Sequence, residues 1–574
     1  MKKRIVYMTA TALTLLFLLS GCSTTQQIKS ISEPVVSVTT DTKVTKKDTE
    51  ISKLEPIVEK EEIIATAEES LLHIISTTHI EGNLFPYDVM EEKELAYSLM
   101  SVANYISSLR EKGENVLLLN SGESVTFDPL LYYYNNIKSD SPHIVPKVYN
   151  EVGYDVVGIG QEDIEVGKDV YMRVLGESNY PYVAANMVDP IHKEPLVDPY
   201  VMIEKDGISI AVVGLTDDST LPFFYSQEVA FEDMVSSSLK WVSVIREKED
   251  ADIIVALVST HQENFGEMAA SIASTFSNGF DVIIGGTDTT SKIVQDLDGK
   301  DVHIVGSMSK GESLNHLQIV FNKDEKTISS ITSMDVDMKG VAPLDTLLDS
   351  YKGAIDEVAS LADVKIGAIA ATLTSREAMF KDSTFVDSIH AIQRKVTNSD
   401  ISISAPLSIN TIIEEGDVTV RDIFRLYPSY HHIYTINLSG QELRDLISYS
   451  SSKWFNPMTS LDDDILRFKK DDYGNFIYNE KTNSFETVSD VSLFDSYSGI
   501  NYIINIAKPE EIQVSIKTME DGRAFSSKTM YSVALNSFIG QGGGGTLASA
   551  GITREMARER IMSVSEKDII SYLL

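Results

Sequence analysis

The sequence predicts a mixed α/β protein built from two domains. Short apolar runs rich in β-branched residues alternate with amphipathic helical stretches through the first half of the chain, which is the pattern of α/β folds. Beyond residue 344, strands and helices follow each other in a less regular order. At 574 residues the chain is also long enough for more than one hydrophobic core.

The first domain is assigned to residues 70–340. We expect buried strands wherever a short apolar run is bounded by glycine or polar residues. These runs lie at 71–77, 116–120, 156–160, 181–186, 210–215, 252–259 and 281–286. Helical periodicity at 94–113 and 236–249 places helices between the strands.

A single amphipathic helix is expected over residues 341–364, where "LDTLLDSYKGAIDEVASLAD" connects the two domains. The second domain is assigned to residues 365–574. Its expected strands contain "YTINLSG", "INYIINIA" and "KTMYSVALNS", and its expected helices contain "STFVDSIHAIQRKV" and "GQELRDLISYSS". The acidic tract "SLDDDILRFKKDDYGN" is expected to be a solvated insertion loop.

The N-terminus has the pattern of a bacterial lipoprotein signal. Three basic residues precede an apolar run from Ile5 to Leu19, which is shorter than the roughly 20 residues of a membrane-spanning helix. The run ends in "LSGC", so we expect residues 1–21 to be cleaved and Cys22 to be acylated. Residues 22–69 are rich in Ser, Thr, Lys and Glu and are predicted to be a disordered tether. The predicted location is the bacterial cell envelope, lipid-anchored and extracytoplasmic.

Composition limits the classes of partner. The chain carries 49 basic and 85 acidic residues, a net charge of −36. Such a surface repels nucleic acid polymers, and the predicted folded part contains no basic cluster. Cys22 is the only cysteine, so no disulfide is available within one chain.

Polar residues collect just after the predicted strands, where α/β enzymes place their sites. The histidines form neither a His-x-His nor a His-x-x-x-His pair, so the common paired-histidine metal signatures are absent. His79 and the carboxylates of Glu81, Glu123 and Asp163 are suited to binding a hard cation such as Mg²⁺, Mn²⁺ or Ca²⁺. The alternative is that these residues are polar caps on solvated loops.

Several longer stretches resemble the 5′-nucleotidase family, and in particular its 2′,3′-cyclic-nucleotide 2′-phosphodiesterase/3′-nucleotidase branch. They include "GNLFPYD", "FVDSIHAIQ", "VTVRDIFRLY" and "ALNSFIGQGGGGTL", and the resemblance runs from Leu71 to Leu574. It implies an N-terminal metallophosphoesterase-like αββα domain, an interdomain helix and a C-terminal substrate domain. It also implies metal-dependent hydrolysis of nucleotides.

The residues that would hold two metal ions in the family are replaced in this sequence. The family pattern places metal ligands or the catalytic histidine at eight positions. Here those positions carry His79, Glu81, Glu123, Gln161, Glu162, Ser259, Thr287 and Thr289, with Glu162 at the catalytic histidine position and His261 two residues out of register. Hydroxyl groups are poor substitutes for imidazole as metal ligands. We therefore expect no catalytic residue and no metal cofactor, the alternative being a divalent cation in a remodelled site.

The resemblance also implies a nucleoside-binding clamp in the second domain. Phe494 matches one aromatic position of the clamp, whereas Tyr430 is one residue away from the other. In "GQGGGGT", Gly542 and Gly543 allow a ligand close to the backbone, or alternatively form a flexible turn. The leading hypothesis is a non-catalytic surface protein that binds a nucleotide, a nucleoside or a protein partner. The alternatives are an active phosphohydrolase with a remodelled metal site, and an adhesin or scaffold.

Overall fold

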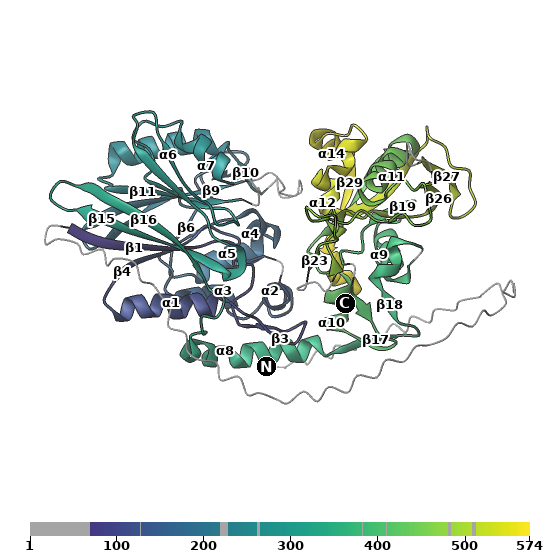
Figure 1. The fold of residues 1–574 in the computed structure, drawn as a ribbon, viewed down its shortest axis with the longest axis horizontal. Coiled ribbons are helices and arrows are strands. Elements are labelled where there is room, and N and C mark those ends of the chain that lie inside the picture. The colour runs from purple at the N-terminus through teal and green to yellow at the C-terminus, as the bar shows by residue number, and fades with distance from the viewer. Residues whose placement is uncertain are drawn as a thin grey trace, which may run out of the picture. The chain divides into compact units, whose positions relative to one another are not determined.

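Two six-stranded sheets face each other in the N-terminal part of the protein (Figure 1). The first has the order β16-β15-β1-β4-β5-β6, and the second has the order β13-β14-β12-β11-β9-β8. The first sheet consists of β1 (Glu69–Thr77), β4 (Asn115–Asn120), β5 (Val156–Gly158), β6 (Tyr182–Val183), β15 (Ser313–Asn322) and β16 (Thr327–Asp337). The second consists of β8 (Tyr200–Lys205), β9 (Ile208–Thr216), β11 (Ile253–Ser259), β12 (Val282–Gly285), β13 (Ser291–Gln295) and β14 (Asp301–Val305).

Alternation along the strands produces the layers. On β11, Val255 and Leu257 pack between the two sheets, whereas Ile254 and Ala256 pack against α6 (Met234–Lys248) and α7 (Phe265–Ala273). Successive side chains on a strand point to opposite faces, so a strand covered on both sides is apolar throughout. Helices α1 (Leu99–Glu111) and α3 (Ile144–Val152) cover the outer face of the first sheet. The result is a four-layer αββα arrangement.

The parallel strands bring their C-terminal loops to one edge. Strands β1, β4, β5 and β6 run parallel in the first sheet, as do β9, β11 and β12 in the second. A Cβ placed on Gly122, after β4, would lie 3.1 Å from the Cβ of Ser259 at the end of β11. The loops that follow the two sheets therefore meet across the interface between them.

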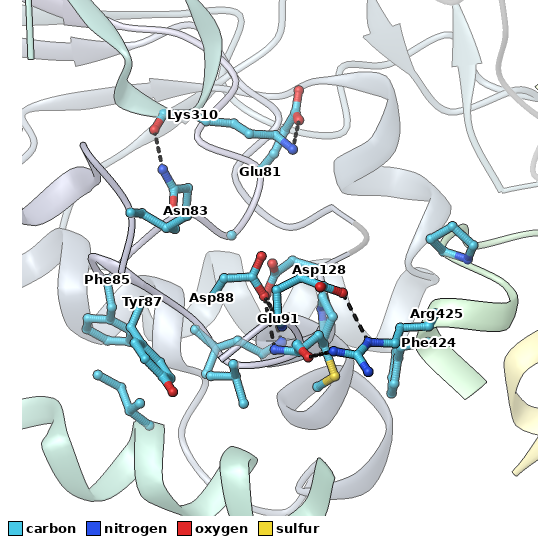
Figure 2. A pocket seen from close by; sticks show the side chains of 18 of the residues that line it. Glu81, Asn83, Phe85, Tyr87, Asp88, Glu91, Asp128, Lys310, Phe424 and Arg425 are labelled. Carbon is cyan, nitrogen blue, oxygen red and sulfur yellow. Dashed lines mark hydrogen bonds and ion pairs between the residues drawn. The ribbon is translucent and has the colours of Figure 1, made fainter. Parts of the chain in front are cut away.

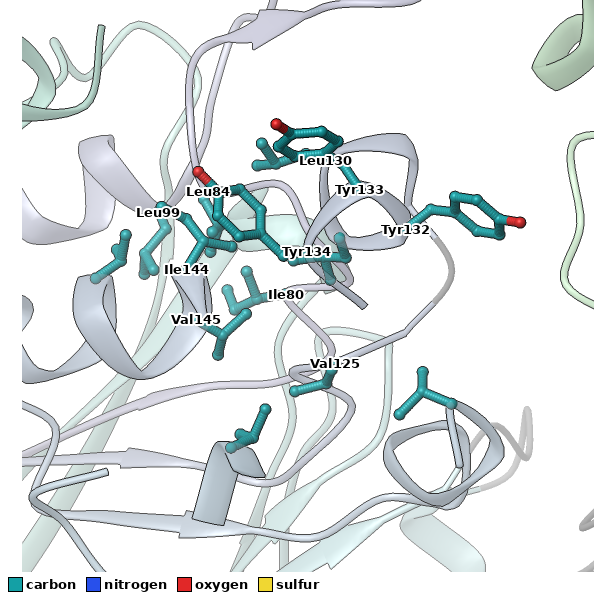
Figure 3. Packing of buried hydrophobic residues seen from close by; sticks show 14 of the residues in the cluster. Ile80, Leu84, Leu99, Val125, Leu130, Tyr132, Tyr133, Tyr134, Ile144 and Val145 are labelled. Carbon is teal, nitrogen blue, oxygen red and sulfur yellow. The ribbon is translucent and has the colours of Figure 1, made fainter. Parts of the chain in front are cut away.

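An apolar cluster packs against these loops and holds them in position (Figure 3). Ile80 and Val125, which come from the loops after β1 and β4, pack with Leu99 at the start of α1 and Ile144 at the start of α3. All four side chains are almost completely buried. The loop positions are therefore set by the same core that holds the helices.

Helix α8 (Asp345–Ala362) leads into the C-terminal part, whose five-stranded sheet has the order β25-β19-β28-β22-β29. Its strands are β19 (Ile401–Ser404), β22 (His432–Ser439), β25 (Ser496–Ser498), β28 (Met530–Asn536) and β29 (Ile561–Asp568). Helices α9 (Thr384–Thr397) and α11 (Gly440–Trp454) pack against this sheet, and β26 (Ile500–Asn505) pairs with β27 (Gln513–Met519). The mixed α/β fold class predicted from the sequence is confirmed.

The computed structural model describes residues 69–126, 128–217, 228–260, 265–381, 383–408, 410–479, 484–507 and 513–574. The predicted signal peptide 1–21, the acylated Cys22 and all but the last residue of the tether 22–69 lie outside these ranges, as does His261. In the described ranges, no helix is both long and apolar enough to cross a membrane.

The acidic insertion differs from its expected form. Asp462 and Asp472 are exposed, as predicted for a solvated loop. Leu466, however, is buried in a small cluster with Trp454 and Phe494. Leu466 folds back onto the second domain because this removes it from water, whereas Leu461 and Tyr473 are almost fully exposed.

Candidate functional site

The predicted metal-ligand positions lie at or just after the C-terminal ends of β1, β4, β5, β11 and β12. The backbone N–H of His79 donates to the carbonyl of Gly122 at 3.2 Å, and the N–H of Glu81 donates to the carbonyl of Glu123 at 3.1 Å. These bonds continue the β1–β4 pairing beyond the ends of the strands. The loops are therefore held side by side by their backbones, independently of any ligand.

The backbone is strained at three of the predicted positions. His79, Glu81 and Glu123 have φ angles of +46°, +47° and +55°. Residues other than glycine rarely occupy this left-handed region, and each such residue costs about 1–3 kcal/mol. Strain of this kind concentrates at functional sites, so the loop geometry of a site is present even though the side chains differ from the family pattern.

Glu123 occupies the centre of the site and is 1% exposed. Its Oε1 accepts a hydrogen bond from the backbone N–H of Gln161 at 2.9 Å, and its Oε2 accepts one from the N–H of Glu162 at 2.8 Å. The hydroxyl of Ser259 donates to Oε1 at 3.3 Å. A Cβ on Gly160 would lie 2.2 Å from the carboxyl carbon, so only glycine leaves room for this side chain. The carboxylate thus caps the short helix α4 (Gln161–Glu165).

Asp163 makes the reciprocal connection from α4 to the Glu123 loop. Its Oδ2 accepts from the N–H groups of Glu123 at 2.9 Å and Gly160 at 2.8 Å. Its Oδ1 accepts from those of Ser124 at 2.7 Å and Val125 at 2.6 Å. Burial raises the pKa of Asp163 to about 7, and the nearby charge of Glu123 adds to this effect. Each carboxylate therefore orders the loop that carries the other.

His79, Glu81 and Lys310 form a second group beside this pair. The Nδ1 of His79 lies 3.6 Å from Oε1 of Glu81, and the ammonium of Lys310 lies 3.6 Å from Oε2 of the same carboxylate. The backbone N–H of Lys310 donates to the carbonyl of His79 at 2.7 Å. Glu81 therefore faces a side-chain cation rather than a cluster of further ligands.

Of the other predicted positions, Gln161 and Glu162 are hydrogen-bonded to Glu123 through their backbone N–H groups, whereas Thr287 and Thr289 are not. Gln161 is buried and its amide donates to Glu165 at 2.7 Å, while Glu162 takes part through its backbone N–H. Thr287 is half-buried and Thr289 is exposed. Among the described residues, no hydrogen bond joins either threonine to the Glu123 group.

The metal ions implied by the family resemblance do not fit these residues. Both carboxylate oxygens of Glu123 are directed at backbone N–H groups, and Ser259 offers only a hydroxyl. Within the described ranges, no group of three or more His, Cys, Asp or Glu side chains is arranged to hold a metal ion. This also applies to the alternative site of His79, Glu81, Glu123 and Asp163, whose carboxylates bind N–H groups and the ammonium of Lys310 instead.

In the second domain, Phe494 is 7% exposed. Its ring packs edge-on against Trp454, with centroids 5.0 Å apart, and against Phe455, with centroids 5.9 Å apart. These contacts make Phe494 part of a small core. A base-stacking role for this ring stays a prediction, and it would require the neighbouring rings to leave one face open.

The other predicted ligand-binding residues have structural contacts of their own. The Tyr430 ring lies edge-on to Tyr132 and to His432, with centroid distances of 6.5 and 5.9 Å. Gly542 has a φ of +102° and open space around it, whereas a Cβ on Gly543 would lie 2.6 Å from the Phe538 ring. Gly543 is thus needed for internal packing, and ligand binding by the glycine turn stays a prediction.

Sequence reasoning missed two charged residues near these sites. Lys310 lies far from Glu81 in the chain, and no motif marked it. Asp495 follows Phe494 directly and is buried, with its Oδ2 accepting from the Thr546 hydroxyl at 3.3 Å. Burial raises the pKa of this carboxyl to about 7. An aspartate inside the apolar, aromatic context "SLFDSYSG" was the available signal.

The chain is similar in sequence to nucleotide phosphoesterases. The family model "5′-nucleotidase, C-terminal domain" matches residues 359–550. A 2′,3′-cyclic-nucleotide 2′-phosphodiesterase/3′-nucleotidase of Yersinia enterocolitica is 22% identical, over 76% of this chain and 74% of its own. A protein of the same description from Salmonella typhimurium is 23% identical, over 82% of this chain and 81% of its own.

Solved structures share the fold. A candidate 5′-nucleotidase from Staphylococcus aureus superimposes with a TM-score of 0.69 at 16% identity, covering 88% of this chain and 96% of that one. A 5′-nucleotidase precursor from Thermus thermophilus gives a TM-score of 0.56 at 18% identity, with the same coverage. The predicted architecture of an N-terminal metallophosphoesterase domain and a C-terminal 5′-nucleotidase domain is confirmed.

Replacing Glu123 should destabilise the protein. Glu123→Ala leaves the buried N–H groups of Gln161 and Glu162 without their acceptor, at about 1–3 kcal/mol for each group. We expect a loss of about 2–5 kcal/mol in the free energy of unfolding, measured by urea denaturation. Glu204→Ala, which removes an exposed glutamate from β8, is the matched control and should change stability by under about 0.5 kcal/mol. Equal effects of the two variants would contradict the role of Glu123.

Asp495 should make stability depend on pH. Its pKa is higher in the folded state than in the unfolded chain, so the folded state retains a proton between about pH 4 and 7. The stability contributed by this proton falls as pH rises through that window, by at most about 1.4 kcal/mol per pH unit. Asp495→Asn stays neutral, so its stability relative to the wild type should increase from pH 5 to pH 8 in urea denaturation. A difference that does not vary with pH would contradict this assignment.

Proposed function

We propose that this chain, which belongs to the 5′-nucleotidase family, is a non-hydrolytic member that binds its ligand without turning it over. The proposal rests on one observation: the carboxylate at the bridging-ligand position, Glu123, hydrogen-bonds the backbone N–H groups of Gln161 and Glu162. A dinuclear centre activates water and stabilises phosphoryl oxygens through its cations. With Glu123 committed to a helix cap and hydroxyls at Ser259, Thr287 and Thr289, this chain lacks the ligands for such cations.

The proposed ligand is a nucleotide or nucleoside. Support comes from the matched C-terminal domain and from the activities for which the relatives are named, which are directed at cyclic and linear nucleotides. Base–aromatic stacking contributes about 1–3 kcal/mol per base, so a domain can bind a nucleoside without a metal. A shift of the melting temperature by adenosine or 5′-AMP separates this function from that of an adhesin or scaffold.

We further propose that the protein acts at the outer surface of a bacterial membrane, held there by lipid on Cys22. The basic start, the short apolar run and the "LSGC" sequence support this location. A second acyl chain makes membrane attachment far more stable than one chain does.

The absence of hydrolysis can be tested directly. With Mn²⁺, Mg²⁺, Ca²⁺ or Zn²⁺ added, purified protein should form no 3′-AMP from 2′,3′-cyclic AMP and release no phosphate from 3′-AMP or 5′-AMP. Its signal should equal that of Glu123→Ala. Thr287→His should remain inactive, because one added imidazole does not complete a two-metal site. A chelator should leave the melting temperature unchanged, since removing a bound ion would lower it. Metal-dependent turnover that Glu123→Ala abolishes would favour the active phosphohydrolase instead.

Lipid anchoring has its own test. Cys22→Ser should move the protein from the membrane fraction to the soluble fraction when cells are lysed and centrifuged, because the acylated residue is lost. Ser23→Ala, one residue further along, is the matched control and should stay with the membrane. The same fractionation for both variants would refute the anchor.

A further inference from the structure

A cavity of about 480 Å³ lies apart from the Glu123 group, beside the hairpin of β2 (Tyr87–Asp88) and β3 (Lys93–Glu94) (Figure 2). It is lined by β2 and the turn that follows, by the start of α2 (Pro129–Tyr132), and by α10 (Val420–Leu426). Its volume falls within the range of small-molecule sites, about 300–1,000 Å³. Glu81 reaches its border, whereas Glu123, Asp163 and Ser259 do not line it.

Aromatic rings make up much of the wall. Phe85 and Phe424 are each 4% exposed, and Tyr87, which also lines the cavity, is 36% exposed. Figure 2 shows Phe85 and Tyr87 on one side of the cavity and Phe424 on the other. Such surfaces attract the body of an organic molecule, and the faces of the rings attract cations.

The charges on the wall are unbalanced. Arg425 is held by Glu91, with Nε 3.1 Å from Oε1, and also donates to the carbonyl of Met90. The ammonium of Lys310 lies 3.6 Å from Glu81. Because Asp88 and Asp128 line the cavity in addition to these two ion pairs, its wall carries more acidic than basic side chains.

Hydrogen bonds to their Oδ1 atoms hold the side chains of Asp88 and Asp128 in place. The Oδ1 of Asp88 accepts from the N–H groups of Met90 and Glu91, and the Oδ1 of Asp128 accepts from those of Leu130 and Leu131. Among the described residues, no hydrogen bond uses Oδ2 of either side chain. Burial raises the pKa of Asp128 to about 7, and the charge of Asp88 adds to the rise while Lys310 opposes it. Figure 2 shows both side chains on the wall of the cavity, near each other.

We propose that this cavity binds a small organic cation, an ammonium group attached to an apolar or aromatic body, with Asp88 and Asp128 receiving the ammonium and Phe85, Tyr87 and Phe424 enclosing the body. The ammonium donates to the Oδ2 atoms, and the rings supply apolar contact and cation–π attraction. A nucleotide does not suit the site, because its phosphates would meet two carboxylates. The proposal does not rest on the absence of hydrolysis.

Phenethylammonium is a suitable probe, and 2-phenylethanol and 3-phenylpropionate are its neutral and anionic analogues of similar size. Isothermal titration calorimetry with the full chain should show binding of phenethylammonium that is at least tenfold tighter than that of either analogue. Equal binding of the alcohol, or no binding of the amine, would overturn the proposal. Stabilisation by Mg²⁺ or Ca²⁺ that is lost in Asp88→Asn would assign the carboxylates to a metal and would also overturn it.

Two variants locate the binding without disturbing the fold. Asp88→Asn and Asp128→Asn keep the Oδ1 acceptor that each local turn needs, but remove the negative charge, and each should weaken binding of phenethylammonium at least tenfold. Asp140→Asn removes an exposed aspartate outside the cavity and is the matched control, with unchanged affinity expected. Unchanged affinity in both cavity variants would place the ligand elsewhere and refute the site.

Discussion

The exchange of hydrogen bonds between Glu123 and Asp163 is the interaction on which the strand-end region depends. Each carboxylate is buried, and each accepts from backbone N–H groups on the loop that carries the other. Burying a carboxylate is unfavourable unless hydrogen bonds replace its water. The loops must therefore stay in register for both charges to be satisfied. This requirement explains the glycine at position 160 and the hydroxyl of Ser259 at the remaining side of the Glu123 carboxylate.

In a metalloenzyme of this architecture, cations would hold such loops together, whereas here the protein's own donors do so. A hydrogen bond to a charged group contributes about 1.5–3 kcal/mol, and the net stability of a domain is only about 5–15 kcal/mol. The crossed carboxylates can therefore offset the backbone strain at His79, Glu81 and Glu123. The loop geometry is held by backbone hydrogen bonds between the loops and by the apolar cluster that packs against them.

In the second domain, the predicted ligand-binding residue Phe494 is likewise engaged in contacts within the protein. Phe494 packs against Trp454 and Leu466, so a tract of acidic composition contributes an apolar side chain to a small core. Asp495 is buried beside this core and is held by Thr546. The Asp495 carboxyl, whose pKa is about 7, and the adjoining aromatic cluster are both buried. The sequence alone does not predict this degree of burial. A cavity of about 480 Å³ lies instead beside the hairpin of β2 and β3.

The sequence by itself determined the layered α/β core, because strands buried on both faces must be apolar at every position, and it placed α8 through its helical period. The resemblance to the family also predicts that Ser259, Thr287 and Thr289 occupy positions where the family has imidazole ligands. Only the tertiary structure decided that Glu123 turns toward backbone N–H groups, because a sequence does not specify which donor a carboxylate faces. The tertiary structure also places Asp88 and Asp128 near each other. Their proximity depends on packing between segments that are separated in the chain, and no local pattern encodes that contact.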